Sequence, residues 1–280
     1  MLLRLVRLEL FKIARKPRTY IAFGAILAIV LLLQLALYKD GETYLRFALQ
    51  SLEGSFGITG TIINGYFVCF VILQTLLVHV PLLIALVAGD SIAGEANMGT
   101  LRLLFSRPVS RSTVLLGKFI AALLYTLGLL VFMAVAALFG SLLLFGPGDL
   151  IILKSDMIVI LDSGDVMWRY ASAFGFAFLA MSTVAALAFF LSLFAENSIG
   201  PIIATMAVVI VCTILTTMDI PMFNALKPWL FTNHMLNWKG FFERPPDGAE
   251  IARSAALLAA HIVVFVGATL LIARKKDILS

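Results

Sequence analysis

Long apolar runs alternate with short polar segments along the whole chain. A helix that crosses a membrane needs roughly 20 apolar residues, and six runs reach that length, at 19–38, 62–88, 113–145, 171–195, 199–218 and 254–273. The second and third runs exceed one bilayer crossing, so we expect their helices to tilt or to extend beyond the membrane. The pattern predicts an all-α integral membrane protein with six transmembrane helices in a single domain.

The connecting segments are short. Only Glu196, Asn197 and Ser198 separate the fourth and fifth runs, which predicts a tight hairpin with Ser198 as the cap of the next helix. We expect 39–61 and 146–170 to form modest loops, with the apolar stretch 151–161 resting at the membrane interface.

The first 17 residues place apolar and basic side chains on opposite faces of a helix. The apolar face holds Leu2, Val6, Leu10 and Ile13, and the basic face holds Arg4, Arg7, Lys12 and Arg15. Such a helix lies at the interface of an anionic membrane, with its basic side toward the lipid headgroups. Pro17 ends it. We therefore predict an interfacial helix at 1–17.

The segment 89–112, between the second and third runs, is polar enough to lie outside the membrane, in water. A helical wheel from Glu95 to Ser106 gathers four apolar side chains on one face, namely Met98, Leu101, Leu104 and Phe105. Glu95, Arg102 and Ser106 lie on another face. Pro108 ends this helix, and Ser110 or Ser112 can cap the next one. A short amphipathic helix between two spans predicts a docking element for a partner protein.

Residues 219–253 combine prolines and few charges with a high density of aromatic side chains: Phe223, Trp229, Phe231, Trp238, Phe241 and Phe242. Aromatic residues concentrate at the membrane–water boundary, and non-helical backbone at that depth must be buried by protein. We predict short helices that dip into the outer leaflet before the last span.

Composition and charge support a membrane protein. The chain is 61% hydrophobic and 13% charged, whereas soluble domains carry about 25% charged residues. Thirteen Lys and Arg residues fall within 4–18, 102–118 and 274–276, and eight fall in the other segments. Because Lys and Arg mark cytoplasmic segments, we expect both termini in the cytoplasm. Cys69 and Cys212 lie in apolar runs and suit core positions better than a disulfide or metal site. No signal peptide pattern precedes the first span.

Motifs of catalysis and nucleotide binding are absent from the sequence. There is no Gly-rich phosphate loop, no His-Glu-x-x-His and no Gly-x-Ser-x-Gly. Residues 146–149 match the Gly-x-Gly-Asp string of intramembrane aspartyl proteases, but no predicted span carries a second Asp, so a turn explains Asp149 better. Asp156, Asp162 and Asp165 fit no calcium-binding loop. We predict no catalytic residue and no metal site.

Five polar residues fall in the apolar runs or at their edges: Gln34, Asn64, Gln74, His79 and His261. Ionisable groups within a membrane are functional candidates because their burial is costly. The alternative is that they form hydrogen bonds within and between helices, and His79, two residues before Pro81, can satisfy a carbonyl freed by a kink. No run carries the Asp or Glu pair expected of a proton- or sodium-driven carrier. We therefore expect the driving energy to come from another protein.

A combination of short motifs carries a family resemblance: Gly94-Glu95, Gly99-Thr100-Leu101, Leu103-Leu104, the Ser-Arg-Pro-Val-Ser-Arg of 106–111, and Gly117-Lys118. With the six-run layout, the amphipathic amino-terminal helix and the ending at 273–279, the chain resembles the permease subunits of bacterial ATP-binding-cassette (ABC) transporters of the type 2 exporter class. The family more often has charged residues where this chain has Ala96-Asn97-Met98.

The resemblance implies a non-catalytic subunit of the bacterial inner membrane. It would pair with a second copy or a close homologue around a translocation path and bind two copies of a cytoplasmic ABC ATPase. ATP and Mg would bind to the ATPase, and this chain would hold no cofactor. Membrane lipids are expected partners and nucleic acid is not. The transported substrate, the need for an extracytoplasmic accessory protein, and the roles of His79 and His261 stay open.

The resemblance also implies roles for two segments. The stretch between the second and third spans corresponds to the coupling helix that fits a groove of the ATPase, and 219–253 corresponds to an outer re-entrant hairpin. The expected ATPase-docking residues are Gly94, Glu95, Met98, Gly99, Thr100, Leu101, Leu104, Phe105, Arg107 and Pro108. The expected outer-gate residues are Trp229 and Trp238.

A six-span membrane enzyme or scaffold that acts on lipid or peptide without ATP coupling is the alternative. An enzyme would need a catalytic pair, which the sequence does not offer. An ATPase gene beside this one would favour the exporter.

Overall fold

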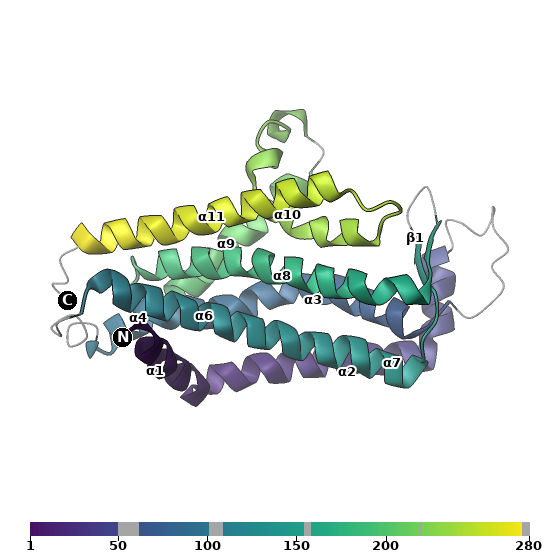
Figure 1. Cartoon of the computed structure of the whole chain (residues 1–280), viewed down its shortest axis with the longest axis horizontal. Coiled ribbons are helices and arrows are strands. Elements are labelled where there is room, and N and C mark those ends of the chain that lie inside the picture. Colours follow the sequence, from purple (N-terminus) through teal and green to yellow (C-terminus); the bar gives the residue numbers. More distant parts are fainter. Residues whose placement is uncertain (50–61, 101–108, 154–157, 219, 276–280) are drawn as a thin grey trace.

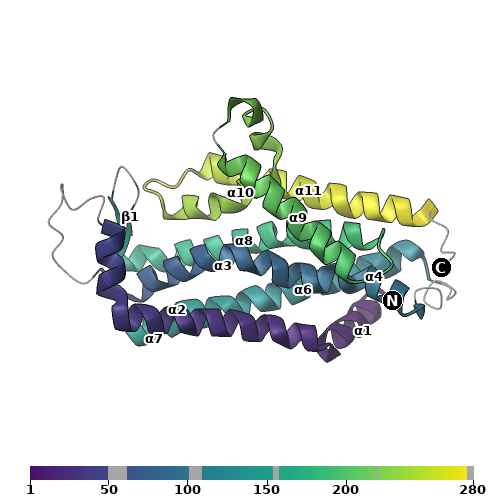
Figure 2. The same cartoon turned by 180° about the vertical axis from the view of Figure 1, so that it is seen from behind.

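The computed structural model describes residues 1–49, 62–100, 109–153, 158–218 and 220–275. Long helices run along the length of the molecule, with α9 crossing the others at an angle (Figures 1 and 2). They are α2 (Pro17–Leu49), α3 (Gly65–Ala88), α6 (Arg111–Ala134), α8 (Ser163–Ser192), α9 (Ile199–Thr217) and α11 (Gly248–Lys275). The prediction of a predominantly helical protein is confirmed.

Five stretches of described helix are long and apolar enough to cross a membrane: Pro17–Gly41, Arg111–Phe145, Ser163–Ser192, Ile199–Thr217 and Gly248–Lys275. The helix α3 is bent by 54° between its halves Gly65–Leu76 and His79–Ala88, and it would be a sixth if the two halves form one crossing. Pro81 lies just beyond the bend; a proline removes one backbone hydrogen bond and clashes with the carbonyl four residues earlier. The set of apolar helices is typical of a multi-pass membrane protein.

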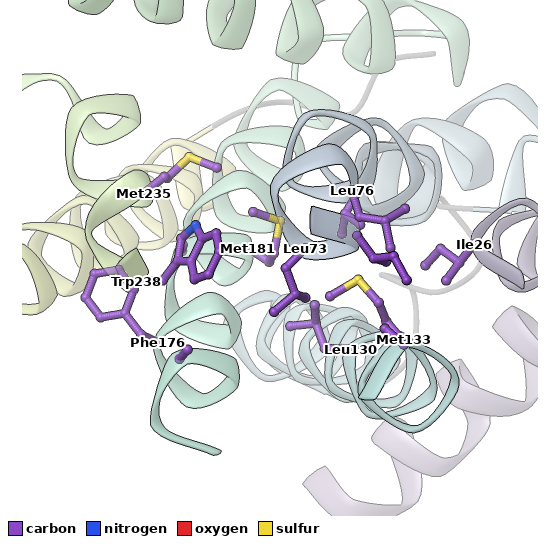
Figure 3. Close-up of a cluster of buried hydrophobic side chains, with 14 of the residues drawn as sticks. Ile26, Leu73, Leu76, Leu130, Met133, Phe176, Met181, Met235 and Trp238 are labelled. Carbon is purple, nitrogen blue, oxygen red and sulfur yellow. The ribbon is translucent and has the colours of Figure 1, made fainter. Parts of the chain in front are cut away.

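The helix α8 lies at the centre of the bundle. In its most apolar stretch 61% of the residues are buried, against 11% in α11. It contacts α3, α6, α9 and α11. Figure 3 shows part of this core, where Met181 of α8 lies between Leu73, on α3, and Trp238, in the segment before α11. The outer helices therefore keep large apolar surfaces, as helices that face lipid do.

The third apolar run is not one uniform helix. It consists of α6, the π-helical turn η1 (Val135–Phe139) and α7 (Gly140–Phe145). The amide of Gln34, on α2, donates to the carbonyl of Ala136 and to Oγ of Ser141, both at 3.1 Å. Gly140 lies against this amide, where a Cβ would come 2.9 Å from Nε2 of Gln34. The polar residue Gln34 thus forms a hydrogen bond between helices, at the place where the helical geometry changes.

The connections differ from the predicted loops. The segments β1 (Leu150–Leu153) and β2 (Ile158–Leu161) pair as antiparallel strands, where the sequence predicted a loop. Leu150 and Leu161 pair across the hairpin and are fully buried, whereas Ile160 is exposed, which is the alternation of a strand with one covered face. In addition, α2 continues to Leu49, and α8 begins at Ser163 because Asp162 caps it by accepting from the N–H of Gly164 at 2.9 Å.

Four short helices connect α9 to α11. They are η2 (Pro221–Phe223), η3 (Lys227–Trp229), α10 (Phe231–Met235) and η4 (Leu236–Phe242). His234 of α10 is buried, with Nδ1 3.0 Å from Oγ of Ser254 on α11 and Nε2 2.8 Å from the carbonyl oxygen of Pro228. These hydrogen bonds fix the short helices to α11.

Candidate functional site

Charged residues of α1, α2, α4 and α6 lie together at one end of the bundle. At this end α1 (Leu2–Arg15) and the last turn of α11 both lie (Figures 1 and 2). We call this the α1 end. The helix α1 packs on the beginning of α6, and α4 (Asp90–Asn97) follows α3 there. At Gly117 of α6 a Cβ would lie 3.2 Å from Cβ of Leu5. The glycine therefore allows α1 to approach α6 closely.

The buried side of α1 follows the predicted apolar face and adds one acidic residue. Val6 is buried, and Leu2, Leu10 and Ile13 are half-buried. The added residue is Glu9, which is buried because its carboxylate pairs with Lys118 of α6.

Four side chains from α1, α4 and α6 form a closed ion network, which we call the Glu9–Lys118 cluster: Glu9, Lys12, Glu95 and Lys118. Nζ of Lys118 lies 2.7 Å from Oε1 of Glu95 and 3.1 Å from Oε2 of Glu9. Nζ of Lys12 lies 2.7 Å from Oε1 of each glutamate. Two cations and two carboxylates balance one another, so the cluster can be buried between the three helices.

The lysines decide the charge state of Glu95. Burial alone would raise the pKa of its carboxyl, but Lys118 and Lys12 outweigh burial and hold that pKa below its usual range. Burial likewise favours the neutral form of Lys12, yet Glu9 and Glu95 raise its pKa. The side chain of Lys118 is only 1% exposed. Removing a fully buried member such as Lys118 costs about 3–5 kcal/mol, since it leaves buried charge uncompensated.

Asp90, the first residue of α4, forms a second charged contact. Its carboxylate accepts from Lys16, from Nη1 of Arg18 at 2.9 Å, and from the hydroxyl of Ser198. Ser198 therefore does not cap α9 as predicted. Instead, Oδ1 of Asn197 accepts from the N–H groups of Ile199 and Gly200. Asp90 thus ties α4 to the beginning of α2 and to the hairpin before α9.

Gly94 lies one turn after Asp90. A Cβ at this position would overlap the Asp90 carboxylate, which is 3% exposed and held by three partners. The backbone of α4 is also held by α8, because Oγ of Ser192 accepts from the N–H groups of Ile92 and Ala93 at 3.1 and 2.9 Å. Gly94 therefore belongs to the packing of α4 against its neighbours.

The predicted helix from Glu95 to Ser106 is not continuous. The helix α4 ends at Asn97, and Gly99 has a φ of +67°, a left-handed conformation that glycine adopts without steric cost. Met98 is exposed, and the hydroxyl of Thr100 donates to the carbonyl of Glu95 at 3.3 Å. Glu95 itself belongs to the Glu9–Lys118 cluster and is buried. The remaining expected docking residues lie outside the described residues: Leu101, Leu104, Phe105, Arg107 and Pro108.

The two tryptophans expected at an outer gate lie in different environments. Trp229 is 68% exposed on η3. Trp238 is 3% exposed and packs against the rings of Phe70 and Phe242, with centroids 5.5 and 5.9 Å away. Nearby, Arg169 of α8 donates to the carbonyls of Phe241 and Glu243 at 2.5 and 2.9 Å, so α8 holds the end of η4.

The histidines in the apolar helices bond within their own helices. Nδ1 of His79 lies 2.9 Å from the carbonyl oxygen of Thr75, and Nδ1 of His261 lies 2.8 Å from that of Leu257. The carbonyl that Pro81 leaves without its usual partner is that of Leu77, so His79 bonds a different one. Within the part of the chain that the structure describes, no group of three or more His, Cys, Asp or Glu side chains could hold a metal ion.

Comparison with known proteins places the chain in a family. The family model described as "Protein of unknown function (DUF2705)" matches residues 25–279. The chain belongs to this family. It is also similar to "Uncharacterized protein YhcI" of Bacillus subtilis (strain 168), with 27% identity over 200 residues. That alignment covers 69% of this chain and 63% of the relative, so the chain spans less than two thirds of the relative's length.

The family match includes Asp90, Glu95 and Lys118, and begins after Glu9 and Lys12. Sequence reasoning placed Glu95 in a docking region but missed the network around it. A local signal was present, because Glu9 is the one acidic residue of 1–17, Asp90 is an isolated charge just after the run 62–88, and Lys118 lies within the run 113–145. Charges in such places need partners, but the sequence does not identify those partners.

Proposed function

We propose that this chain is the transmembrane permease subunit of an ATP-driven ABC exporter of the type 2 class. It would form a translocation path with a second copy or a close homologue, and two copies of a cytoplasmic ATPase would supply the energy. The observation that carries the proposal is the ion pair between Glu95 and Lys118. It joins Gly94-Glu95 and Gly117-Lys118, two of the motifs on which the resemblance to these permeases rests.

The contacts of α4 provide a route for mechanical coupling. Glu95 connects it to α1 and α6, Asp90 connects it to α2 and to the hairpin before α9, and Ser192 connects it to α8. A force applied by an ATPase just after α4 would therefore act on several helices together. In this account the exposed Met98 and the segment 101–108 meet the ATPase, and Glu95 holds the coupling region to the membrane part.

The proposal includes a topology. The chain crosses the bacterial inner membrane six times, with α3 as one bent crossing and both termini in the cytoplasm. The α1 end then faces the ATPase, and the four short helices of 219–253 form the outer re-entrant segment that closes the path. The charge at the α1 end supports this orientation, since Arg and Lys mark cytoplasmic segments.

The proposal is tested by purifying the chain with its native partners in mild detergent, then identifying the co-purifying proteins and measuring the mass of the complex. We expect two permease chains and two ATPase subunits, since a chain with one docking segment engages one nucleotide-binding subunit. A monomer that is fully active without an ATPase would contradict the proposal and favour a membrane enzyme or scaffold.

A further inference from the structure

A cavity of about 1000 Å³ opens between α1 and the helix ends beside it. One face of α1 lines it with Arg4, Leu8, Phe11 and Arg15, which recur at helical spacing. The two arginines are eleven residues apart, or roughly 16 Å along the helix. This face is apolar in its middle and basic at both ends.

The lining carries more positive than negative charge. Six cationic side chains line the cavity: Arg4, Lys12, Arg15, Lys16, Arg18 and Lys118. The carboxylates are Asp90 and the two glutamates of the Glu9–Lys118 cluster, and these pair with four of the six cations. Arg4 and Arg15 form no ion pair with a described residue, and the guanidinium of Arg15 lies 4.8 Å from the centroid of the Phe11 ring. An anionic group would balance this excess.

The lining also leaves apolar surface uncovered. Leu8 and Phe11 are each 58% exposed, and Val87 of α3 lines the same cavity. A small polar anion would leave Leu8 and Phe11 in water, and a neutral lipid would leave the arginines without a counter-charge. The volume is at the upper end of small-molecule sites and suits a headgroup with part of one acyl chain.

We propose that this cavity binds one molecule of an anionic phospholipid. Its phosphate lies at Arg15, beside Lys16 and Arg18, and one acyl chain covers Leu8 and Phe11. The proposal is more specific than the general attraction of a basic helix to an anionic leaflet, because it assigns one lipid to one place. It requires no ATPase, so it stands independently of the proposed function.

The chain offers a matched control for the basic part of the site, at Arg15, and one for its apolar part, at Leu8. Arg7 is exposed on α1 and lies outside the cavity lining, so Arg7→Gln removes the same charge from a position of the same helix that does not line the cavity. Leu3 is 85% exposed and also lies outside the lining, so Leu3→Ser is the control for Leu8→Ser. Circular dichroism and thermal unfolding of every variant verify that the fold is kept.

The test titrates delipidated, detergent-solubilised protein with phosphatidylglycerol and counts bound lipids by native mass spectrometry. We expect saturation at one phosphatidylglycerol per chain and at least tenfold weaker binding of phosphatidylcholine. Arg15→Gln should weaken phosphatidylglycerol binding at least tenfold, Leu8→Ser should weaken both lipids, and Arg15→Lys should restore part of the binding. Arg7→Gln and Leu3→Ser should bind as the wild type does.

Three outcomes of the lipid titration would overturn the proposal. These are equal binding of the two lipids, binding that does not saturate, and an equal loss in Arg7→Gln and Arg15→Gln, which would indicate general surface attraction. A protein partner that occupies the cavity and excludes phosphatidylglycerol would also overturn it. Co-purification of the ATPase is scored on the same samples, so a failed lipid site and a failed exporter assignment give different results.

Discussion

Nζ of Lys118 lies 2.7 Å from Oε1 of Glu95, and the lysine side chain is almost completely shielded from solvent. Lys118 follows Gly117 near the beginning of α6, and Glu95 follows Gly94 in the middle of α4. The pair therefore holds α4 to a helix that is long and apolar enough to cross a membrane. Glu9 and Lys12 extend this connection to α1.

Lys118→Met should destabilise the protein strongly. It leaves Glu9 and Glu95 with Lys12 as their single cation, and breaking a buried ion network costs about 3–5 kcal/mol. Lys12→Met should cost about 1 kcal/mol or less, because the Lys12 side chain is 45% exposed and exposed ion pairs contribute little. Thermal unfolding in detergent measures both. If the two substitutions lower the unfolding free energy equally, burial of the lysine does not determine the size of the loss.

The stability of the α1 end should depend on pH in two windows. The folded-state pKa of Glu95 is lowered, so its contribution is complete above its unfolded-state pKa of about 4.5 and is lost as the pH falls further through the folded-state pKa. The pKa of Lys12 is raised, so its contribution is complete below about 10.5 and is lost as the pH rises through the folded-state pKa. Unfolding temperatures between pH 3 and pH 11 should therefore show a plateau in the middle.

Glu95→Gln is the control for the acid side of this profile. This variant should have a lower unfolding temperature on the plateau, and its unfolding temperature should fall less below pH 4.5, because the carboxyl group that titrates there is gone. If the unfolding temperature of this variant falls below pH 4.5 as steeply as that of the wild type, another carboxylate causes the acid sensitivity.

Gly94→Ala should destabilise the protein by about 1–3 kcal/mol, the usual cost of overpacking. The new methyl group would displace the Asp90 carboxylate from Lys16 and Arg18. The matched control is Gly128→Ala in α6, where a Cβ meets nothing within 4 Å. That change should stabilise by up to about 1 kcal/mol, since alanine is the better helix former. The prediction fails if the two unfolding temperatures shift in the same direction.

The tryptophans of the short helices should behave differently. Trp238→Ala should cost about 3–5 kcal/mol, because truncating a buried aromatic side chain leaves a cavity. Trp229→Ala should change the unfolding free energy by less than about 0.5 kcal/mol, as is usual for an exposed site. If the segment closes the path, both Trp229→Ala and Trp238→Phe should disturb export and keep the ATPase bound. Release of the ATPase from the membrane by either change would indicate the opposite topology.

The sequence predicts the long helices well, because a run of about twenty apolar residues has few other structures available to it. The hairpin of β1 and β2 was missed, since short apolar runs do not distinguish a strand from a buried segment of another kind. The break at Gly99 was missed because the apolar spacing continues across it. Only the left-handed backbone at that glycine ends the helix.

The candidate site could be predicted only in part. The motifs locate Glu95 and Lys118, but their pairing and the roles of Glu9 and Asp90 are tertiary contacts between distant segments, and a local pattern does not encode them. Ser198 illustrates this limit. Its position before a helix favours a cap, yet its hydroxyl donates to Asp90 because α4 lies next to the hairpin.

The central claim, that the segment after α4 couples this chain to an ATPase, is tested most directly by the affinity of the ATPase for docking variants. The measurement is a quantitative pull-down from membranes, after normal insertion of each variant has been verified. Burying one large apolar side chain contributes roughly 1.5–3 kcal/mol, so Leu104→Asp should weaken binding at least tenfold. Arg107→Ala should have a smaller, salt-dependent effect, as a charge at the rim of an interface does, and Trp229→Ala should have none. Binding of Leu104→Asp at the wild-type level would contradict the coupling role of this segment.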